Sequence, residues 1–261
     1  MCRRIHAAAI RKKYKKERVK QMNQPKAIGI IGAMAAETAL LIARMTKTET
    51  VTVAGADYHC GVLEGVPAVV VQCGIGKVYA AIAAQIMIDR FSVGAIINTG
   101  IAGGVKSGLA VGDLVLSTDA VQHDFDLSMF GYAKGYMKVG DKDKPTRYPA
   151  DRELMSRFRA AAERVLRENR CVEGTIASGD CFIDNNAQKK EIAAFFDAAA
   201  VEMEGGAIAQ VAFANRVPFI VVRAISALAD DDAAVFSEDF EEKAATVSGN
   251  IVLEMLRGYA E

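Results

Sequence analysis

The chain of 261 residues lacks the residue patterns of a metal-dependent or disulfide-bonded protein. Its three histidines do not cluster, and no two of its five cysteines have CxxC spacing. We therefore expect no structural metal and no cofactor, and we interpret the thiols as reduced, which is typical of a cytoplasmic protein. The cysteines are Cys2, Cys60, Cys73, Cys171 and Cys181.

Long apolar segments are missing as well. No apolar run approaches the roughly 18 residues that a membrane-spanning helix needs, so we expect no membrane partner. The basic N-terminal stretch is not followed by the apolar region of a secretory signal. With 51% hydrophobic and 25% charged residues, the composition is that of a globular protein.

Acidic side chains are scarce at the N-terminus, where residues 1–20 contain nine basic residues and only Glu17 as an acid. The whole chain has zero net charge, so the part that follows is acidic, which argues against nucleic-acid binding. We expect residues 1–26 to form a disordered basic extension and residues 27–261 to form a single domain. Patterned sequence begins only at Ala27, and we interpret Met22 as the true start of the protein.

Strands alternate with helices from Ala27 onward, because short apolar runs ended by glycine or polar residues predict buried strands. Strands are predicted at residues 27–31, 58–63, 68–73, 95–98, 113–121, 172–177, 200–203 and 219–225. Helices are predicted at residues 34–45, 77–90, 151–167, 186–196, 204–215 and 238–257, and residues 123–150 are polar and irregular. This order predicts an α/β fold, with a mixed β-sheet covered by helices on both faces.

Ligands of such folds bind at the carboxyl ends of the strands, and several unusual residues lie there. Glu37 follows the first strand; it is either a first-turn acid favoured by the helix dipole or a base that polarises water. Two glycine-rich turns, residues 74–76 and 100–104, either bring backbone N–H groups close to a ligand or are simple turns.

Charged residues also occur within two strands that should be buried. Glu202 and Glu204 lie at the end of the strand at 200–203, and Arg223 lies within the strand at 219–225, which leads to Ser226. Buried carboxylates need partners, and a carboxylate in a cleft can accept hydrogen bonds from both hydroxyls of a ribose. The alternative is a salt bridge to a basic residue such as Arg223.

Eight segments in order resemble the 5'-methylthioadenosine/S-adenosylhomocysteine nucleosidases of the purine nucleoside phosphorylase superfamily. They are IGIIGAMAAE, CGIGKVYAA, INTGIAGGV, GDLVLSTDAVQHDFD, MFGYAKG, SGDCFI, AVEMEGGAIAQVA and VPFIVVRAIS. The resemblance implies a three-layer α/β/α sandwich, a homodimer, and hydrolysis of the bond between adenine and a 5'-thioribose. Such a reaction needs an acid for adenine N7, an activated water and a firmly held ribose.

The resemblance also implies a role for each site residue. Glu37, helped by Arg223, should bind the attacking water, and Glu204 should hold the ribose hydroxyls. The remaining substrate-binding residues should be Met203 against the sugar, Gly103 beneath it, Ser226 at the strand end, Phe182 and the backbone of Ile183 at adenine, and Ile75, Leu127, Phe130 and Phe236 around the 5' substituent. Leu127 and Phe130 are expected to reach in from a partner subunit.

Three departures from the family pattern stand out. Ala227 occupies the position of the general-acid aspartate, and Asp230 is too distant along the chain to replace it. Ile101 stands where many members have serine, and Phe236-Ser237 inverts the usual Ser-Phe. Because general acids contribute about 10²–10⁴-fold, we expect the activity to be strongly reduced. Ala227 is either an engineered change that traps bound substrate or a natural loss in a binding protein.

Two other functions remain open. A nucleoside phosphorylase would need cationic or hydroxyl donors for phosphate, but residues 100–105 contain no arginine and Glu37 would repel the anion. A binding module without turnover would hold methylthioadenosine intact. The helix at 77–90 is apolar on most faces, so it must be buried nearly all round, either in the core or in a dimer interface.

Overall fold

The structure, a computed structural model, describes residues 26–167, 170–228 and 238–260. Most of the expected N-terminal extension, with Met22, lies outside the described residues, as do Asp230 and Phe236. The strands are β1 (Ile28–Gly32), β2 (Thr46–Val53), β3 (Ala56–Leu63), β4 (Val66–Gln72), β5 (Ala95–Gly104), β6 (Leu114–Gln122), β7 (Tyr148–Pro149), β8 (Cys171–Ser178), β9 (Ala198–Glu202) and β10 (Phe219–Leu228). The helices are α2 (Ala35–Arg44), α3 (Lys77–Phe91), α4 (Arg152–Val165), α5 (Asn186–Phe196), α6 (Gly205–Asn215) and α7 (Glu238–Ala260), with one 3-10 turn, η1 (Ser128–Phe130).

The ten strands form one mixed sheet in the order β10-β6-β8-β9-β5-β1-β4-β3-β2, with β7 beside β6. Strands β1, β4, β5 and β10 are rich in Ile, Val, Ala and Gly and pair in parallel, as expected for strands buried on both faces. Strand β10 also pairs with β5, so that β10, β6, β8, β9 and β5 close into a ring. The other strands extend from this ring as an open sheet.

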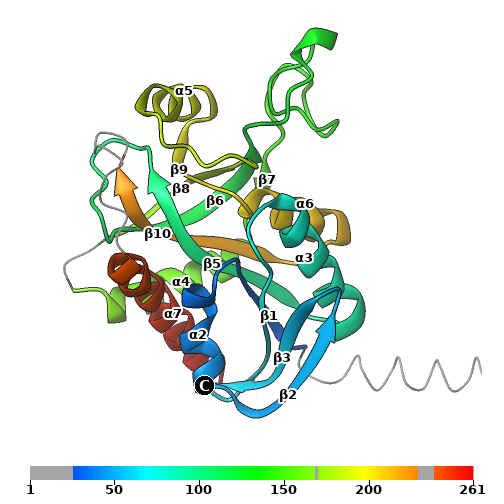
Figure 1. Cartoon of the computed structure of the whole chain (residues 1–261), viewed down its shortest axis with the longest axis vertical. Coiled ribbons are helices and arrows are strands. Elements are labelled where there is room, and N and C mark those ends of the chain that lie inside the picture. The colour runs from blue at the N-terminus through cyan, green and yellow to red at the C-terminus, as the bar shows by residue number, and fades with distance from the viewer. Residues whose placement is uncertain (1–25, 168–169, 229–237, 261) are drawn as a thin grey trace, which may run out of the picture.

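Helices cover both faces, which gives the three layers that the sequence predicts (Figure 1). On one face, α2, α4 and α7 contribute Leu41, Phe158 and Ile251 to a single apolar cluster. On the other face, α3 and α6 contribute Met87 and Ile208 to a second cluster. Among the described helices, none has the length and apolarity needed to cross a membrane.

The segment between β6 and β7 projects away from the sheet as an arm, green in Figure 1, which carries η1 near its end. Its irregular, polar character agrees with the sequence-based prediction. The arm begins at His123, which is buried at the end of β6, and returns to the body at Tyr148. It is rooted directly beside the residues of the site described below.

Three details of the predicted elements are wrong. Strand β2 was not predicted, because its sequence TKTETVTV is polar, exposed at most positions and lies at the sheet edge. Strand β5 does not end at Asn98 but continues through the glycine-rich segment to Gly104. Helix α3 is not buried all round within one copy of the chain, because Val78, Tyr79 and Ile82 are exposed, so the core alone does not bury it and a dimer interface stays a prediction.

Candidate active site

The site lies where β5 changes partners. The first half of β5, up to Asn98, pairs with β1, whereas its end, at Gly103 and Gly104, pairs with β9 in the opposite direction. Neither neighbour pairs with the backbone of residues 99–102 on this side. Strand β9 runs towards this gap, so its last residue, Glu202, and the two residues after it arrive beside the carboxyl end of β1. Strand ends at which the pairing order changes are where α/β sheets bind ligands.

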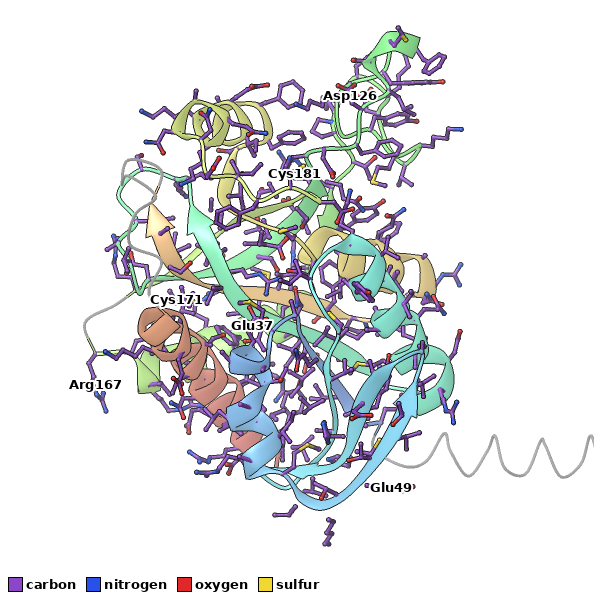
Figure 2. The ribbon with its side chains drawn as sticks, viewed as in Figure 1. Glu37, Glu49, Asp126, Arg167, Cys171 and Cys181 are labelled. Carbon is purple, nitrogen blue, oxygen red and sulfur yellow. The ribbon has the colours of Figure 1, made fainter. Side chains whose placement is uncertain are left out.

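Glu37 fills part of the gap with its carboxylate. Its Oε2 accepts hydrogen bonds from the backbone N–H groups of Ala33 at 2.6 Å and Met34 at 3.0 Å, and its Oε1 accepts one from Ile101 at 3.0 Å. Glu37 therefore replaces the missing strand partner of β5. Figure 2 shows Glu37 beside the strands, at the start of α2. A carboxylate oxygen has two lone pairs, so Oε1 can accept one further hydrogen bond.

Arg223 is only 1% exposed and lies on β10, opposite Gly100 of β5. Its guanidinium donates to Asn98 Oδ1 at 2.7 Å from Nη2, and to Glu202 Oε2 from Nε at 3.1 Å and from Nη2. The third nitrogen, Nη1, has no hydrogen-bond partner in the described structure. A methyl group placed on Gly100 would overlap both Arg223 Nη1 and Glu37 Oε1, so these two atoms face the same small space.

Two neighbouring carboxylates have different surroundings. Glu202 accepts hydrogen bonds from Arg223, from Ser178 Oγ and from the backbone of Gly205. Burial would raise the pKa of Glu202, but Arg223 and the Ser178 hydroxyl lower it below its ordinary value. Burial, followed by repulsion from Glu202, raises the pKa of Glu204 to about 7. Glu202 thus forms the salt bridge that the sequence left as an alternative, and Glu204 is the carboxylate with capacity for a ligand.

Glu204 contacts the glycine-rich turn before α3. The backbone N–H of Gly76 donates to Glu204 Oε1 at 2.8 Å, and Glu204 Oε2 lies 3.6 Å from Arg223 Nη2. The next N–H, that of Lys77, donates to Asp180 Oδ1 at 2.7 Å. Asp180 belongs to the loop after β8, close to Cys181, which is labelled in Figure 2. The turn therefore connects the carboxylate cluster with the loop that carries Phe182.

The end of β10 brings Ala227 into the same region. Ala227 lies opposite Gly103 of β5, which in turn pairs with Val201 of β9. The register between β10 and β5 shifts at this point, so that Ser226 is the extra residue of a β-bulge. Ser226 Oγ is 3.4 Å from the carbonyl oxygen of Ala102. Ala227 offers only a methyl group, and no proton, to this side of the gap.

The other predicted site residues differ in their exposure and lie on several separate segments. Phe182 and Ile75 are exposed on the two loops joined by Asp180, and Met203 is half-buried between Glu202 and Glu204. The side chain of Ile183 packs into an apolar cluster with Ala177 and Val201, so only its backbone could face a ligand. Leu127 and Phe130 lie on the arm, and Phe130 is 73% exposed. Within one copy of the chain, the arm does not bring them into the cluster around Glu37.

The sequence did not identify two residues that orient the cluster. Asn98, the last residue of the predicted fifth strand, donates to the carbonyl oxygen of Ile31 at 2.9 Å and accepts from Arg223. Ser178 bonds Glu202 and accepts from the backbone N–H of Gly206 at 2.5 Å. A polar residue at the end of an otherwise apolar strand is the signal that could have marked both. The described residues contain no group of histidines, cysteines and acids able to hold a metal ion.

Comparison with known proteins identifies relatives of the whole chain. The family model of the phosphorylase superfamily matches residues 27–257. The chain is 41% identical over 231 residues to a 5'-methylthioadenosine/S-adenosylhomocysteine nucleosidase of Shewanella loihica, covering 88% of this chain and 98% of that protein.

Solved structures agree. A nucleosidase of the same kind from Colwellia psychrerythraea, solved with adenine, has a TM-score of 0.82 at 38% identity, covering 89% of this chain and 95% of the other. A futalosine hydrolase mutant of Helicobacter pylori also has a TM-score of 0.82, at 31% identity, over 89% and 99% of the two chains. Both the length of these matches and the level of identity show that the chain belongs to the 5'-methylthioadenosine/S-adenosylhomocysteine nucleosidase family of the phosphorylase superfamily.

Proposed function

We propose that this chain, a hydrolase by family, binds 5'-methylthioadenosine and S-adenosylhomocysteine and hydrolyses their N-ribosidic bond to adenine and the 5-thioribose product at a rate limited by Ala227. The observation that carries the proposal is the convergence of Glu37, Glu204 and Arg223 on one gap in the sheet, bordered by the turn at Gly76 and the loop of Phe182. Each group has a distinct task in breaking this bond.

The water is assigned to the space between Glu37 Oε1 and Arg223 Nη1. Arg223 Nη1 is a buried donor without a partner, which is costly unless a ligand or water completes its hydrogen bond. Glu37 Oε1 can accept a hydrogen bond from the same water. When the bond between adenine and C1' breaks, the water oxygen bonds to C1' and its proton passes to Glu37.

The nucleoside is assigned to the neighbouring surfaces. Glu204, which is held by the N–H of Gly76, accepts hydrogen bonds from the ribose hydroxyls, and Met203 packs against the sugar. Phe182 stacks on adenine, the backbone of Ile183 binds its edge, and Ile75 lines the pocket for the 5'-thio substituent. Gly103 and Ser226 lie below the sugar at the end of β5 and β10.

Ala227 limits the reaction because adenine leaves as an anion unless N7 gains a proton. The alanine methyl supplies none, so the proton must come from solvent. If the missing proton donor abolished the reaction completely, the chain would bind the nucleoside and keep it intact. Ile101, in place of a hydroxyl-bearing serine, further reduces the polarity beside Glu37.

The geometry around Glu37 favours water over phosphate as the nucleophile. The N–H groups of Ala33, Met34 and Ile101 form a cluster of donors that could bind an anion, but the carboxylate of Glu37 occupies all three. A phosphate ion would meet this negative charge at short range. The phosphorylase reaction is therefore the less favoured alternative.

A homodimer is also part of the proposal. Val78 and Ile82 are one helical turn apart on α3, and both expose their side chains, as does Ile75 just before the helix. A second copy would cover this apolar face and would bring Leu127 and Phe130 of its arm to the 5' pocket.

The described cysteines are free thiols, which suits the reducing cytoplasm.

Release of adenine from methylthioadenosine tests the function. We expect slow, phosphate-independent release by the chain as it is, and a gain of about 10²–10⁴-fold on substitution Ala227→Asp. Ala227→Asn is the matched control, because the amide has a similar volume but is not an acid, and it should give no comparable gain. Absence of any gain with aspartate, or release that requires phosphate, would refute the proposed reaction.

A further inference from the structure

The first residue of α3 is a lysine, which is unusual for its position. The N-terminus of a helix carries a partial positive charge, so an acidic residue is favoured there and a cation is not. The first turn of α3 contains no acid, and Gly76 at the N-cap has no side chain to accept a hydrogen bond. Local helix chemistry therefore does not explain Lys77, and its partners lie elsewhere in the chain.

Carboxylates from other elements cap this helix instead. The N–H of Gly76 donates to Glu204 Oε1 at 2.8 Å, and the N–H of Lys77 donates to Asp180 Oδ1 at 2.7 Å. Two consecutive backbone donors thus bind the sugar-site carboxylate and the base of the Phe182 loop. The spacing between these two carboxylates is fixed by the turn that carries the donors.

The side chain of Lys77 secures the same junction. Its ammonium donates to Asp124 Oδ1 at 2.6 Å and to Gln122 Oε1 at 3.1 Å, and it lies 4.0 Å from Asp180 Oδ2. Asp124 in turn accepts the N–H of Asp180 at 2.9 Å through its other oxygen. The lysine side chain is only 16% exposed, so this pairing is shielded from solvent more than a surface ion pair.

The network reaches three elements that border the nucleoside. Gln122 ends β6 and bonds Gln210 of α6 at 2.8 Å, Asp124 is the second residue of the arm, and Asp180 lies in the loop of Phe182. Burial would raise the pKa of Asp124, but the bonds from Lys77 and Asp180 lower it, so the carboxylate stays charged at neutral pH. Without the ammonium, the negative charges of the Asp124 and Asp180 carboxylates would repel each other, although the backbone N–H of Asp180 still donates to Asp124.

The geometry points to Lys77 as a positioning residue that sets the distance between the ribose-binding Glu204 and the adenine-covering loop at residues 179–183. This inference rests on the proposed function of that site. In this role Lys77 acts through the turn, which it holds against Asp180, and it balances the charge of the two aspartates. A ligand that spans both halves of the site depends on their separation, whereas a ligand that fills one half does not.

Calorimetry with methylthioadenosine and with free adenine tests this division. We expect Lys77→Met to weaken methylthioadenosine binding by roughly ten- to hundred-fold, because a misplaced Glu204 loses a charge-assisted hydrogen bond to the ribose and such a loss has an effect of this order, and to weaken adenine binding by a much smaller factor. Lys77→Arg should restore most of the affinity. Lys144→Met, which removes an exposed pair with Asp141 at 3.8 Å, is the matched control and should change neither.

Equal losses for both ligands, or no loss for either, would overturn the inference. Hydrogen exchange of the ligand-free protein gives a second measurement that does not depend on the ligand. Lys77→Met should speed exchange at residues 74–77 and 179–183 together, and unchanged exchange at residues 179–183 would also overturn the inference. If the unaltered chain binds no methylthioadenosine while exchange responds as expected, the proposed function fails and the coupling of the two loops stands.

Discussion

Glu204 differs from the other acids of the site because its pKa, raised to about 7, falls within the range of ordinary assays. An acid with a higher pKa in the folded state than in the unfolded state binds more protons when folded, at pH values between the two. The free energy of unfolding therefore falls as pH rises from about 4.5 through about 7. Ribose binding by the ionised carboxylate should strengthen over the same range.

The substitution Glu204→Gln should remove this pH dependence. Between about pH 5 and about pH 8.5, the variant should gain as much as about 3 kcal/mol in unfolding free energy relative to the unaltered chain. Urea unfolding at both pH values measures the difference. Burial lowers the pKa of His123, which has the opposite effect on stability in this range, but His123 is present in both proteins and cancels. Parallel pH curves for the two proteins would contradict the assignment.

A substitution at Gly100 tests whether Glu37 Oε1 and Arg223 Nη1 face the same space. A methyl group at this position would overlap the facing atoms of both side chains, each of which is buried. We expect Gly100→Ala to abolish methylthioadenosine binding and to destabilise the fold by about 1–3 kcal/mol, as overpacking does.

Gly258 provides the control for that change. It lies in α7, where a methyl group would approach only Arg164, at 3.9 Å. Gly258→Ala should be neutral or stabilise the helix by about 0.5–1 kcal/mol. Calorimetric binding and thermal unfolding of both variants give the comparison. Normal binding by Gly100→Ala would exclude a water site between Glu37 and Arg223.

The sequence identified the charged members of the cluster because charge within a buried strand is costly and therefore informative. Glu204 and Arg223 stand out in this way, and Glu37 does so through its place after β1. Asn98 and Ser178 were missed, since small polar residues at strand ends are common and only the structure shows that they bond Arg223 and Glu202. The roles of Phe182 and Ala227 came from resemblance, not from physical reasoning.

At the scale of elements, the sequence pattern predicted the buried strands and all six described α-helices, but not β2 at the sheet edge or the short β7. Strand β2 has β-branched residues without an apolar face, so no alternation marks it. The prediction that β5 ends at Asn98 was wrong because the glycines at residues 100–104 were interpreted as a turn. Its glycines are not a turn: at Gly100 the missing side chain admits Glu37 and Arg223. A glycine run after a buried strand can therefore continue the strand where other side chains must approach closely.

Strand β5 changes its pairing partner along its length, and this change creates the candidate site. The strand leaves β1 after Asn98 and joins β9 at Gly103, and the free edge between them receives the carboxylate of Glu37. No local pattern predicts this, because pairing between β5 and β9 joins segments about a hundred residues apart. Periodicity places Glu37 and Glu204 at strand ends but does not show that the two ends meet.

At the scale of the whole molecule, the apolar side of α3 requires a partner that one copy of the chain does not provide. Val78 is 69% exposed and Ile82 is 43% exposed, whereas Ala83, Ala84 and Met87 on the opposite side are buried. A helix that is apolar on both sides is stable in water only when both are covered. The exposed side continues into Ile75 of the candidate site, so the proposed dimer contact and the proposed nucleoside pocket would share a border.

We expect the unaltered chain to be a dimer in light scattering at micromolar concentration, and Ile82→Glu to be a folded monomer, because association would bury an unpaired carboxylate of each copy in the apolar contact. Phe195→Glu, on the similarly exposed surface of α5, is the control and should leave the dimer intact. If the arm of one copy completes the 5' pocket of the other, the monomeric variant should bind methylthioadenosine weakly while retaining its affinity for adenine. A monomeric unaltered chain, or a monomeric variant with full affinity for methylthioadenosine, would show that each pocket is complete within one chain.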